Sequence, residues 1–304
     1  MPLILDINQA KTLSRKKRSK KLAPVRSPSK AERILRIRTE QLWDKVIMPS
    51  LERIKAAIAS GVNQGQLSMI LERELSQAQW FYGAEVDQIV DMWRLATDQI
   101  TRVKLNDALR RSLGIDITTI LDDPTVAQAM AMGAWEAESL IKTMPTKLMG
   151  DVAQAVMANF RGVPLPEGRS LLEQIDFLGT RSKKWAKLIA RDQTAKLTGV
   201  LNQTRQQGLG IDEYYWKTMQ DGRVVGNPTG KYPEWNDTHK NHFIMEGKLC
   251  KWSDPTVYST DDGKTWKRRT SAMPMGGVPE GINCRCLPMA RIDLDKIMEF
   301  ALTQ

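Results

Sequence analysis

QGQLSMILERELSQAQWFYGAEVDQIVDMW, residues 64–93, is the stretch that decides the fold class of this chain. Its apolar side chains recur every three or four residues, and they are Leu67, Ile70, Leu71, Leu75, Trp80, Val86, Ile89, Val90 and Trp93. This spacing places them along one stripe of an α-helix. It predicts a long helix over residues 64–113 that packs against other helices through the stripe.

The same periodicity continues upstream of this helix. Ser29 is a suitable N-cap, and apolar residues at helical spacing follow it as far as Ile58. Gly61 is expected to end this helix. Pro49 lacks a backbone N–H, so we expect it to kink or split the segment.

Downstream of residue 113, prolines and glycines divide the helical pattern. Pro124 and Pro145 are each expected to open a helix, because proline is tolerated in a first turn. GVPLPEG, residues 162–168, contains two prolines and two glycines and reads as a break. Two further helices are predicted over residues 170–177 and 183–207.

The C-terminal third differs in composition from the helical part. The last 104 residues contain ten of the 19 aromatic residues of the chain. Short strands are predicted over residues 214–219, 251–252 and 257–258, and a closing helix over residues 294–302. Within TDDGKTW, residues 260–266, Asp262-Gly263 is typical of a type I′ hairpin turn between Tyr258 and Trp266.

We therefore expect a mainly α N-terminal region followed by a small α+β domain. The predicted divisions are a basic flexible arm at residues 1–28, a helical domain at 29–165 and the α+β domain at 166–304. The uncharged stretch at residues 124–135 is too short to cross a bilayer, and so is the longer one at residues 56–71. The first residues also lack a secretory signal pattern, so we expect neither a membrane protein nor a secreted disulfide scaffold.

Charge is concentrated at the N-terminus. Residues 1–40 carry a net charge of +9 out of the total of +10. Such runs are typical of tails that bind nucleic acid, without sequence preference, or an acidic protein surface, although a tail that only aids solubility has the same composition. The candidate binding residues are Arg15, Lys16, Lys17, Arg18, Lys20, Lys21 and Arg26.

All three cysteines and both histidines lie within one stretch of 48 residues. They are His239, His242, Cys250, Cys284 and Cys286. Thiolate and imidazole are the ligands that zinc prefers, so this set is a candidate structural zinc site and zinc the candidate cofactor. Cys-x-Cys is tighter than the usual ligand spacing, and buried reduced cysteines with hydrogen-bonded histidines remain the alternative.

Two other patterns are candidate catalytic sites. Asn236, Asp237 and Asn241 beside the histidines have the composition of a metal-dependent nuclease, but no spacing supports one. A second set of charged residues comprises Arg191, Asp192, Arg205, Asp221 and Arg223. Such residues form a structural salt-bridge network more often than a catalytic site. No nucleotide-binding loop or hydrolase triad is present in the sequence.

A third pattern lies in the predicted hairpin. Ser259 to Trp266 matches the Asp-box motif of propeller hairpins, S-x-D-x-G-x-T-W. The motif occurs once, whereas a propeller needs repeats. We therefore interpret it as turn chemistry.

Residues 185–288 as a whole resemble the phage Mu F-like head morphogenesis family, also called minor head proteins. The resemblance rests on seven elements in order, which are KLIARDQT (187–194), Leu201-Asn202-x-x-Arg205, Gly210-Ile211, Tyr215-Trp216-x-Thr218-x-x-Asp221-x-Arg223-Val224, His242-x-x-Met245-x-Gly247, Pro279 and Asn283-Cys284-Arg285-Cys286. Residues 225–238 form an insertion before the histidine. The resemblance implies that Arg191, Asn202, Arg205, Trp216, Thr218, Asp221, Arg223, His242, Gly247, Cys284 and Cys286 are the structural residues of the motif.

The resemblance also implies a function. Such a protein is a low-copy virion component that binds the portal protein or the major capsid protein, with a scaffold protein as a further candidate partner. It acts in head assembly, DNA packaging or DNA ejection, first in the host cytoplasm and then in the virion head, and it is not an enzyme. The alternative is a metal-dependent nucleic-acid-processing enzyme built on the C-terminal His/Cys cluster.

Overall fold

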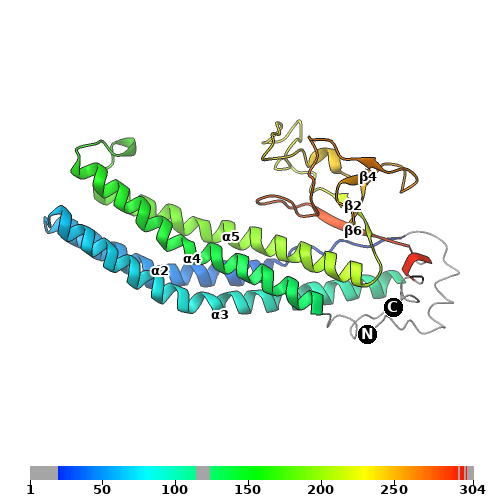
Figure 1. Ribbon diagram of the computed structural model, residues 1–304, viewed down its shortest axis with the longest axis horizontal. Helices are drawn as coiled ribbons and strands as arrows, with labels where there is room; N and C mark the ends of the chain where they lie inside the picture. The colour runs from blue at the N-terminus through cyan, green and yellow to red at the C-terminus, as the bar shows by residue number, and fades with distance from the viewer. Residues whose placement is uncertain (1–19, 114–123, 294, 298, 300–304) are drawn as a thin grey trace. The chain divides into compact units, whose positions relative to one another are not determined.

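The computed structural model describes residues 20–113, 124–293, 295–297 and 299. Four long helices precede a small sheet region, which confirms the predicted fold class (Figure 1). The helices are α2 (Ser29–Ala59), α3 (Gln64–Leu113), α4 (Pro124–Phe160) and α5 (Leu171–Gly208). The strands are β1 (Lys20–Lys21), β2 (Glu213–Lys217), β3 (Leu249–Lys251), β4 (Val257–Ser259), β5 (Lys267–Arg268) and β6 (Leu287–Ile292), with short 3-10 helices η1 (Pro166–Gly168) and η2 (Phe243–Met245).

The described chain forms two compact units. Unit 2 comprises Ser29–Ala96 and Gly133–Gln193. Unit 1 comprises the described residues before Ser29, those between Thr97 and Met132, and those from Thr194 onward. This division differs from the predicted boundary at 165/166, because α3, α4 and α5 each contribute residues to both units. The break at 162–168 is the turn between α4 and α5 and lies inside unit 2.

Unit 2 is a bundle of four helices around an apolar core. Trp43 of α2 and Tyr82 of α3 are buried and pack edge to face, with ring centroids 6.3 Å apart. Exposed ion pairs join each helix to the next around the bundle, and these are Lys45–Glu85, Lys142–Asp87, Arg181–Asp151 and Lys183–Asp44. Exposed pairs contribute little, so burial of the apolar stripes holds the bundle together.

Three predicted helix breaks are wrong. Helix α2 is continuous through Pro49, so the expected split does not occur, and α4 is continuous through Pro145 instead of beginning there. A proline inside a helix costs about 3 kcal/mol. Each apolar side chain that is buried contributes about 1.5–3 kcal/mol, and Met144 and Leu148 beside Pro145 are both buried, so packing outweighs the lost hydrogen bond.

The third break was expected between residues 177 and 183, where α5 is instead continuous. Gly179 lies in this stretch and is a packing residue. A Cβ atom on Gly179 would lie 2.7 Å from Cδ1 of Leu51 in α2. The missing side chain therefore lets α5 approach α2 closely. Trp80 is a further correction, since it was placed on the buried stripe but is 70% exposed.

The sheet of unit 1 is antiparallel, with strand order β1-β6-β2-β3-β4-β5. The predicted strands near residues 214, 251 and 257 are confirmed as β2, β3 and β4. Strand β6, which lies between β1 and β2, was not predicted. Its residues alternate between half-buried and buried, but Pro288 within it argues against a strand in the sequence.

The predicted hairpin is also confirmed. Asp262 and Gly263 both have positive φ, 60° and 87°, as a type I′ turn requires. Ser259 and Thr265 donate hydrogen bonds to the Asp261 carboxylate, and these bonds lower the pKa of Asp261. The residues of the Asp-box motif therefore stabilise a turn, as the sequence predicts. Of the predicted closing helix, residues 295–297 and 299 are helical, and its other residues lie outside the described chain.

Residues 20–28 do not form a flexible arm as predicted. Leu22 and Val25 are buried in a core with Leu105, Leu209 and Ile292. The backbone N–H of Leu22 donates to the carbonyl of Ala290, which continues the pairing of β1 with β6. Residues 20–28 therefore belong to the fold of unit 1, because their apolar side chains complete its core.

Glu213 at the start of β2 gives unit 1 a pH-dependent contact. Its carboxylate accepts hydrogen bonds from Arg291 of β6 and, at 2.7 Å, from Lys296. Burial alone would raise the pKa of Glu213, but the hydrogen bonds from Lys296 and Arg291 outweigh it and lower the pKa. The ionised form is therefore favoured in the folded state.

At neutral pH, Glu213→Gln is expected to lower the free energy of unfolding by about 1.5–3 kcal/mol, the usual worth of a hydrogen bond to a charged group. A lowered pKa confers stability above the unfolded pKa, and that stability is lost as the pH falls through the folded value. The deficit of the variant should therefore shrink once the pH falls below 4.5. Denaturant titrations across acidic pH, with Glu52→Gln on the exposed face of α2 as control, measure this. A deficit that stays constant into strong acid would contradict it.

Candidate metal centre

Three of the five candidate metal ligands lie together in unit 1. The Nδ1 atom of His242 is 3.5 Å from the Sγ atom of Cys284 and 3.6 Å from that of Cys286. All three ligand atoms lie within 4.8 Å of one another. His242 and Cys284 are half-buried, whereas Cys286 is buried.

The local backbone structure around His242 and around the two cysteines positions these side chains. His242 immediately precedes η2, and its backbone N–H donates to the carbonyl of Val225. Cys284 and Cys286 lie in the extended segment that leads into β6. Between them, the guanidinium of Arg285 donates to both carboxylate oxygens of Asp221 at 2.7 Å, and this ion pair lowers the pKa of Asp221.

The two thiols are electrostatically different. A hydrogen bond from Cys286 lowers the pKa of the Cys284 thiol, and His242 lowers it further. The pKa of Cys286 is raised in turn, because it is the partner that keeps the proton. Trp216 of β2 packs edge-on to His242, with ring centroids 5.8 Å apart, and its buried indole N–H lies beside the Cys286 thiol, where it partly offsets the rise in the pKa of Cys286.

His239 and Cys250 are not part of this cluster. His239 is exposed and lies in a turn in which its backbone N–H donates to Asn236. Cys250 is fully buried in β3, its Sγ is 3.7 Å from the carbonyl of Lys248, and burial raises the pKa of its thiol. The five-residue cluster predicted from the sequence therefore contains three ligands that meet and two that do not.

The remaining motif residues near β2 make structural contacts with each other. Gly247 has a φ of +73° and donates its N–H to the carbonyl of Trp216. The backbone N–H and the hydroxyl of Thr218 both donate to the Glu246 carboxylate. Burial would raise the pKa of Glu246, but the hydrogen bonds from Lys217 and Thr218 outweigh it and lower the pKa. Glu246 was missed in the sequence, although it adjoins the Gly247 of the motif.

The predicted Arg/Asp set does not form one network. Buried Arg205 donates to Thr101 and Asp98 of α3, and Asn202 donates to the carbonyl of Val25. Arg191 and Asp192 belong to unit 2, whereas Arg205, Asp221 and Arg223 belong to unit 1. Arg223 is exposed, and its backbone N–H donates to Asp221. These contacts stabilise the fold, which is a more common role for buried charged residues than catalysis.

One buried cation was missed. Arg269 is 6% exposed, and its Nη1 donates to the carbonyls of Pro274 and Gly276. Its guanidinium lies over the Trp216 ring, 5.4 Å from the centroid. In sequence it ends the run Lys267-Arg268-Arg269, and nothing there separates it from two exposed neighbours. Only the fold of the loop decides which of the three is buried.

The basic residues of the arm divide into two groups. Arg15, Lys16, Lys17 and Arg18 lie outside the described residues. Lys20 and Lys21 form β1, and the ammonium group of Lys21 lies 4.2 Å from the centroid of the Tyr215 ring. Arg26 is exposed.

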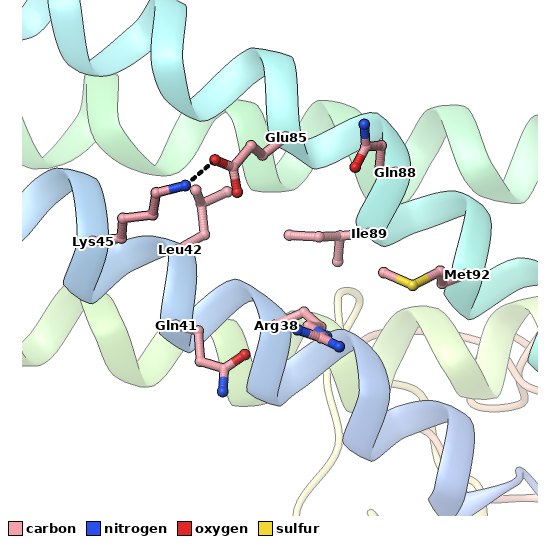
Figure 2. Close-up of a pocket in the computed structure, with 8 residues that line it drawn as sticks. All are labelled: Arg38, Gln41, Leu42, Lys45, Glu85, Gln88, Ile89 and Met92. Atoms are coloured by element: carbon pink, nitrogen blue, oxygen red, sulfur yellow. Dashed lines mark hydrogen bonds and ion pairs between the residues drawn. The ribbon is translucent and has the colours of Figure 1, made fainter.

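A pocket of about 260 Å³ lies between α2 and α3 within unit 2 (Figure 2). The Lys45–Glu85 ion pair crosses it (Figure 2). Its lining is Arg38, Gln41, Leu42, Lys45, Glu85, Gln88, Ile89 and Met92. The lining contains no cysteine or histidine, so the Cys/His cluster of unit 1 is the stronger candidate for a metal site.

The fold and the cluster define a chain with a helical-bundle unit and a mixed unit that carries a Cys₂His group. A protein of Haemophilus influenzae named "Uncharacterized protein" is 27% identical over 181 residues, which are 59% of this chain and 36% of that protein. This chain thus spans about a third of the length of that relative. No family model matches the chain, and no solved structure matches it. Within the described residues, no helix combines the length and apolar character needed to cross a membrane.

Proposed function

We propose that this chain is a minor head protein of a tailed phage. It binds the portal protein or the major capsid protein, in few copies, and acts in head assembly, DNA packaging or ejection. It is found in the host cytoplasm during assembly and then in the virion head, and it works as a structural component and not as an enzyme. The N-terminal basic residues contact DNA or an acidic protein surface.

The observation that carries the proposal is the pairing of the motif elements in unit 1. Asp221 pairs with Arg285, His242 lies against Cys284 and Cys286, and Trp216 pairs with Gly247. Motif residues that are far apart in the sequence thus contact each other in the fold. This is the pattern of a motif that maintains a fold, and it suits a structural component of a particle.

Co-expression with the neighbouring portal and coat proteins tests the proposal. The chain is expected to co-sediment with portal rings or proheads at low stoichiometry, and particle imaging should locate it there. A variant with Arg15, Lys16, Lys17 and Arg18 all replaced by glutamine separates specific docking from charge attraction, because it removes four positive charges and leaves residues 20–304 unchanged in sequence. A chain that remains free of every particle component would overturn the proposal.

The same variant tests the role of the arm. Each phosphate contact contributes about 0.9 to the slope of log K against log salt, so the loss of four contacts should lower the slope for duplex DNA by about 3–4. Replacement of the exposed Lys264, Lys267 and Arg268 is the control and should change the slope less. Equal slopes for the wild type and the arm variant would remove DNA contact from the proposal.

The second candidate is a metal-dependent nucleic-acid-processing enzyme. The observation that favours it is a cluster with three protein ligands, because catalytic zinc sites keep a fourth position for water or substrate. It predicts a metal-dependent activity on DNA or RNA that His242→Ala abolishes. Inactivity of the folded, metal-loaded chain on these substrates would exclude it.

A further inference from the structure

We infer that His242, Cys284 and Cys286 bind one Zn²⁺ ion, through Nδ1 of the imidazole and the two thiolate sulfurs, with a water molecule as the fourth ligand. This inference is independent of the proposed phage role. It concerns the chemistry of unit 1, whichever particle or partner the chain serves.

The two nitrogen–sulfur distances match a zinc tetrahedron. With Zn–S of about 2.3 Å and Zn–N of about 2.0–2.1 Å, tetrahedral angles place nitrogen and sulfur ligands about 3.5–3.6 Å apart. The two N···S distances are 3.5 Å and 3.6 Å. The imidazole nitrogen therefore already has the spacing to each sulfur that one shared ion imposes. The two sulfurs lie within 4.8 Å of each other, and binding of the ion would bring them to about 3.8 Å.

Hydrogen bonding explains this arrangement less well. A neutral imidazole nitrogen carries either one proton or one lone pair, so it can make a good hydrogen bond with one sulfur only. Here two sulfurs converge on the same Nδ1 atom at nearly equal distances. A metal ion at the centre of the three atoms satisfies all of them together.

The surroundings suit a neutral zinc complex. Two thiolates and a neutral imidazole balance the charge of Zn²⁺, so the complex can lie beside an apolar cluster without a large desolvation cost. Cys286 belongs to such a cluster, with Met245, Trp252 and Val278. His242 and Cys284 are half-buried, so water can reach the fourth position.

Groups around the ligands complete the site. The indole N–H of Trp216 is fully buried beside the Cys286 thiol, and its ring lies against His242. A metal-bound thiolate is an acceptor for such a donor, and partners of this kind are a usual part of metal sites. The double hydrogen bond from Arg285 to Asp221 holds the backbone between the two cysteines.

The ion would join two distant parts of unit 1. His242 is 42 residues from Cys284, and the loops between β2 and η2 and between β5 and β6 contain little regular structure. A shared ion fixes the start of η2 to the segment that enters β6. Zinc removal should therefore loosen unit 1 and leave the helical bundle of unit 2 folded.

Metal analysis of the full chain, purified under reducing conditions and dialysed against zinc, tests the inference. One zinc per chain is expected. His242→Ala, Cys284→Ser and Cys286→Ser should each lose it, whereas the matched controls His239→Ala and Cys250→Ala should keep it. Trp216→Phe, which removes the indole N–H, should weaken zinc binding by about 10- to 100-fold.

Cobalt substitution of the unmutated chain gives a test that does not depend on folding of the variants. Co²⁺ should produce the visible bands of tetrahedral geometry and a thiolate charge-transfer band, which zinc then displaces. Absence of both metals from the wild-type chain would overturn the inference. So would equal metal loss in the two control variants, or a Cys284–Cys286 disulfide in the reduced preparation.

Discussion

Arg205→Ala is expected to lower the free energy of unfolding of unit 1 by about 3–5 kcal/mol, the usual cost of removing one partner from a buried ion pair. The Arg205 side chain is 1% exposed and pairs with Asp98, whose side chain is 19% exposed. It also donates to Thr101 Oγ1 at 2.8 Å. Alanine would leave the largely buried Asp98 carboxylate without the cation that pairs with it.

Burial lowers the pKa of Arg205, and the attraction of Asp98 opposes this. A guanidinium remains charged in proteins, so the effect of the substitution does not come from its titration. The free energy of unfolding is measured by denaturant titration, followed by near-ultraviolet circular dichroism of the aromatic residues of unit 1.

Two variants make this prediction specific. Arg36→Ala removes an i,i+4 pair with Glu40 on the surface of α2 and should cost only about 0.3–0.5 kcal/mol. Arg205→Met combined with Asp98→Leu replaces both charges by apolar groups and should recover much of the loss. A cost below about 1 kcal/mol for Arg205→Ala would show that the pair is solvated, since exposed pairs are worth no more than that.

Trp43→Ala is expected to destabilise unit 2 by about 3–5 kcal/mol, as a large-to-small change in a packed core does. Trp43 is fully buried and is among the largest side chains of the core. Its loss removes the edge-to-face contact with Tyr82 and leaves a cavity between α2 and α3. The helical signal in far-ultraviolet circular dichroism measures the transition.

The matched control is Trp135→Ala in α4 of the same unit. Trp135 is 71% exposed, so the same chemical change should alter the free energy of unfolding by no more than about 0.5 kcal/mol. The two tryptophans lie in similar periodic patterns of the sequence, and the structure alone separates them. Similar effects in both variants would contradict the assignment of the core.

Helices were predictable from the sequence because their signal is local. Gly61 beyond the end of α2, Pro124 at the start of α4 and the apolar spacing of residues 64–113 all lie within a few residues of the features they predict. The same is true of the Asp262-Gly263 turn, where positive φ is a property of the residues themselves. Local sequence therefore determined the fold class and most element positions.

Tertiary contacts decided the features that local signals contradict. Packing keeps α4 helical through Pro145, and the close approach of α2 to α5 requires a glycine at position 179. Strand β6 forms despite Pro288, because β1 and β2 pair with it on its two sides. In each case the stabilising partner lies far away in the sequence, where no local pattern reports it.

The candidate metal site was likewise predictable from the sequence only in part. Composition was enough to single out five cysteines and histidines within one stretch, since ligand types can be read residue by residue. Which of them meet depends on the path of the loops. That path brings His242 to Cys284 and Cys286, leaves His239 in an exposed turn, and buries Cys250 in β3. The sequence alone thus supplied the ligand chemistry, and the long-range packing of β2, η2 and β6 selected the three residues that can share an ion.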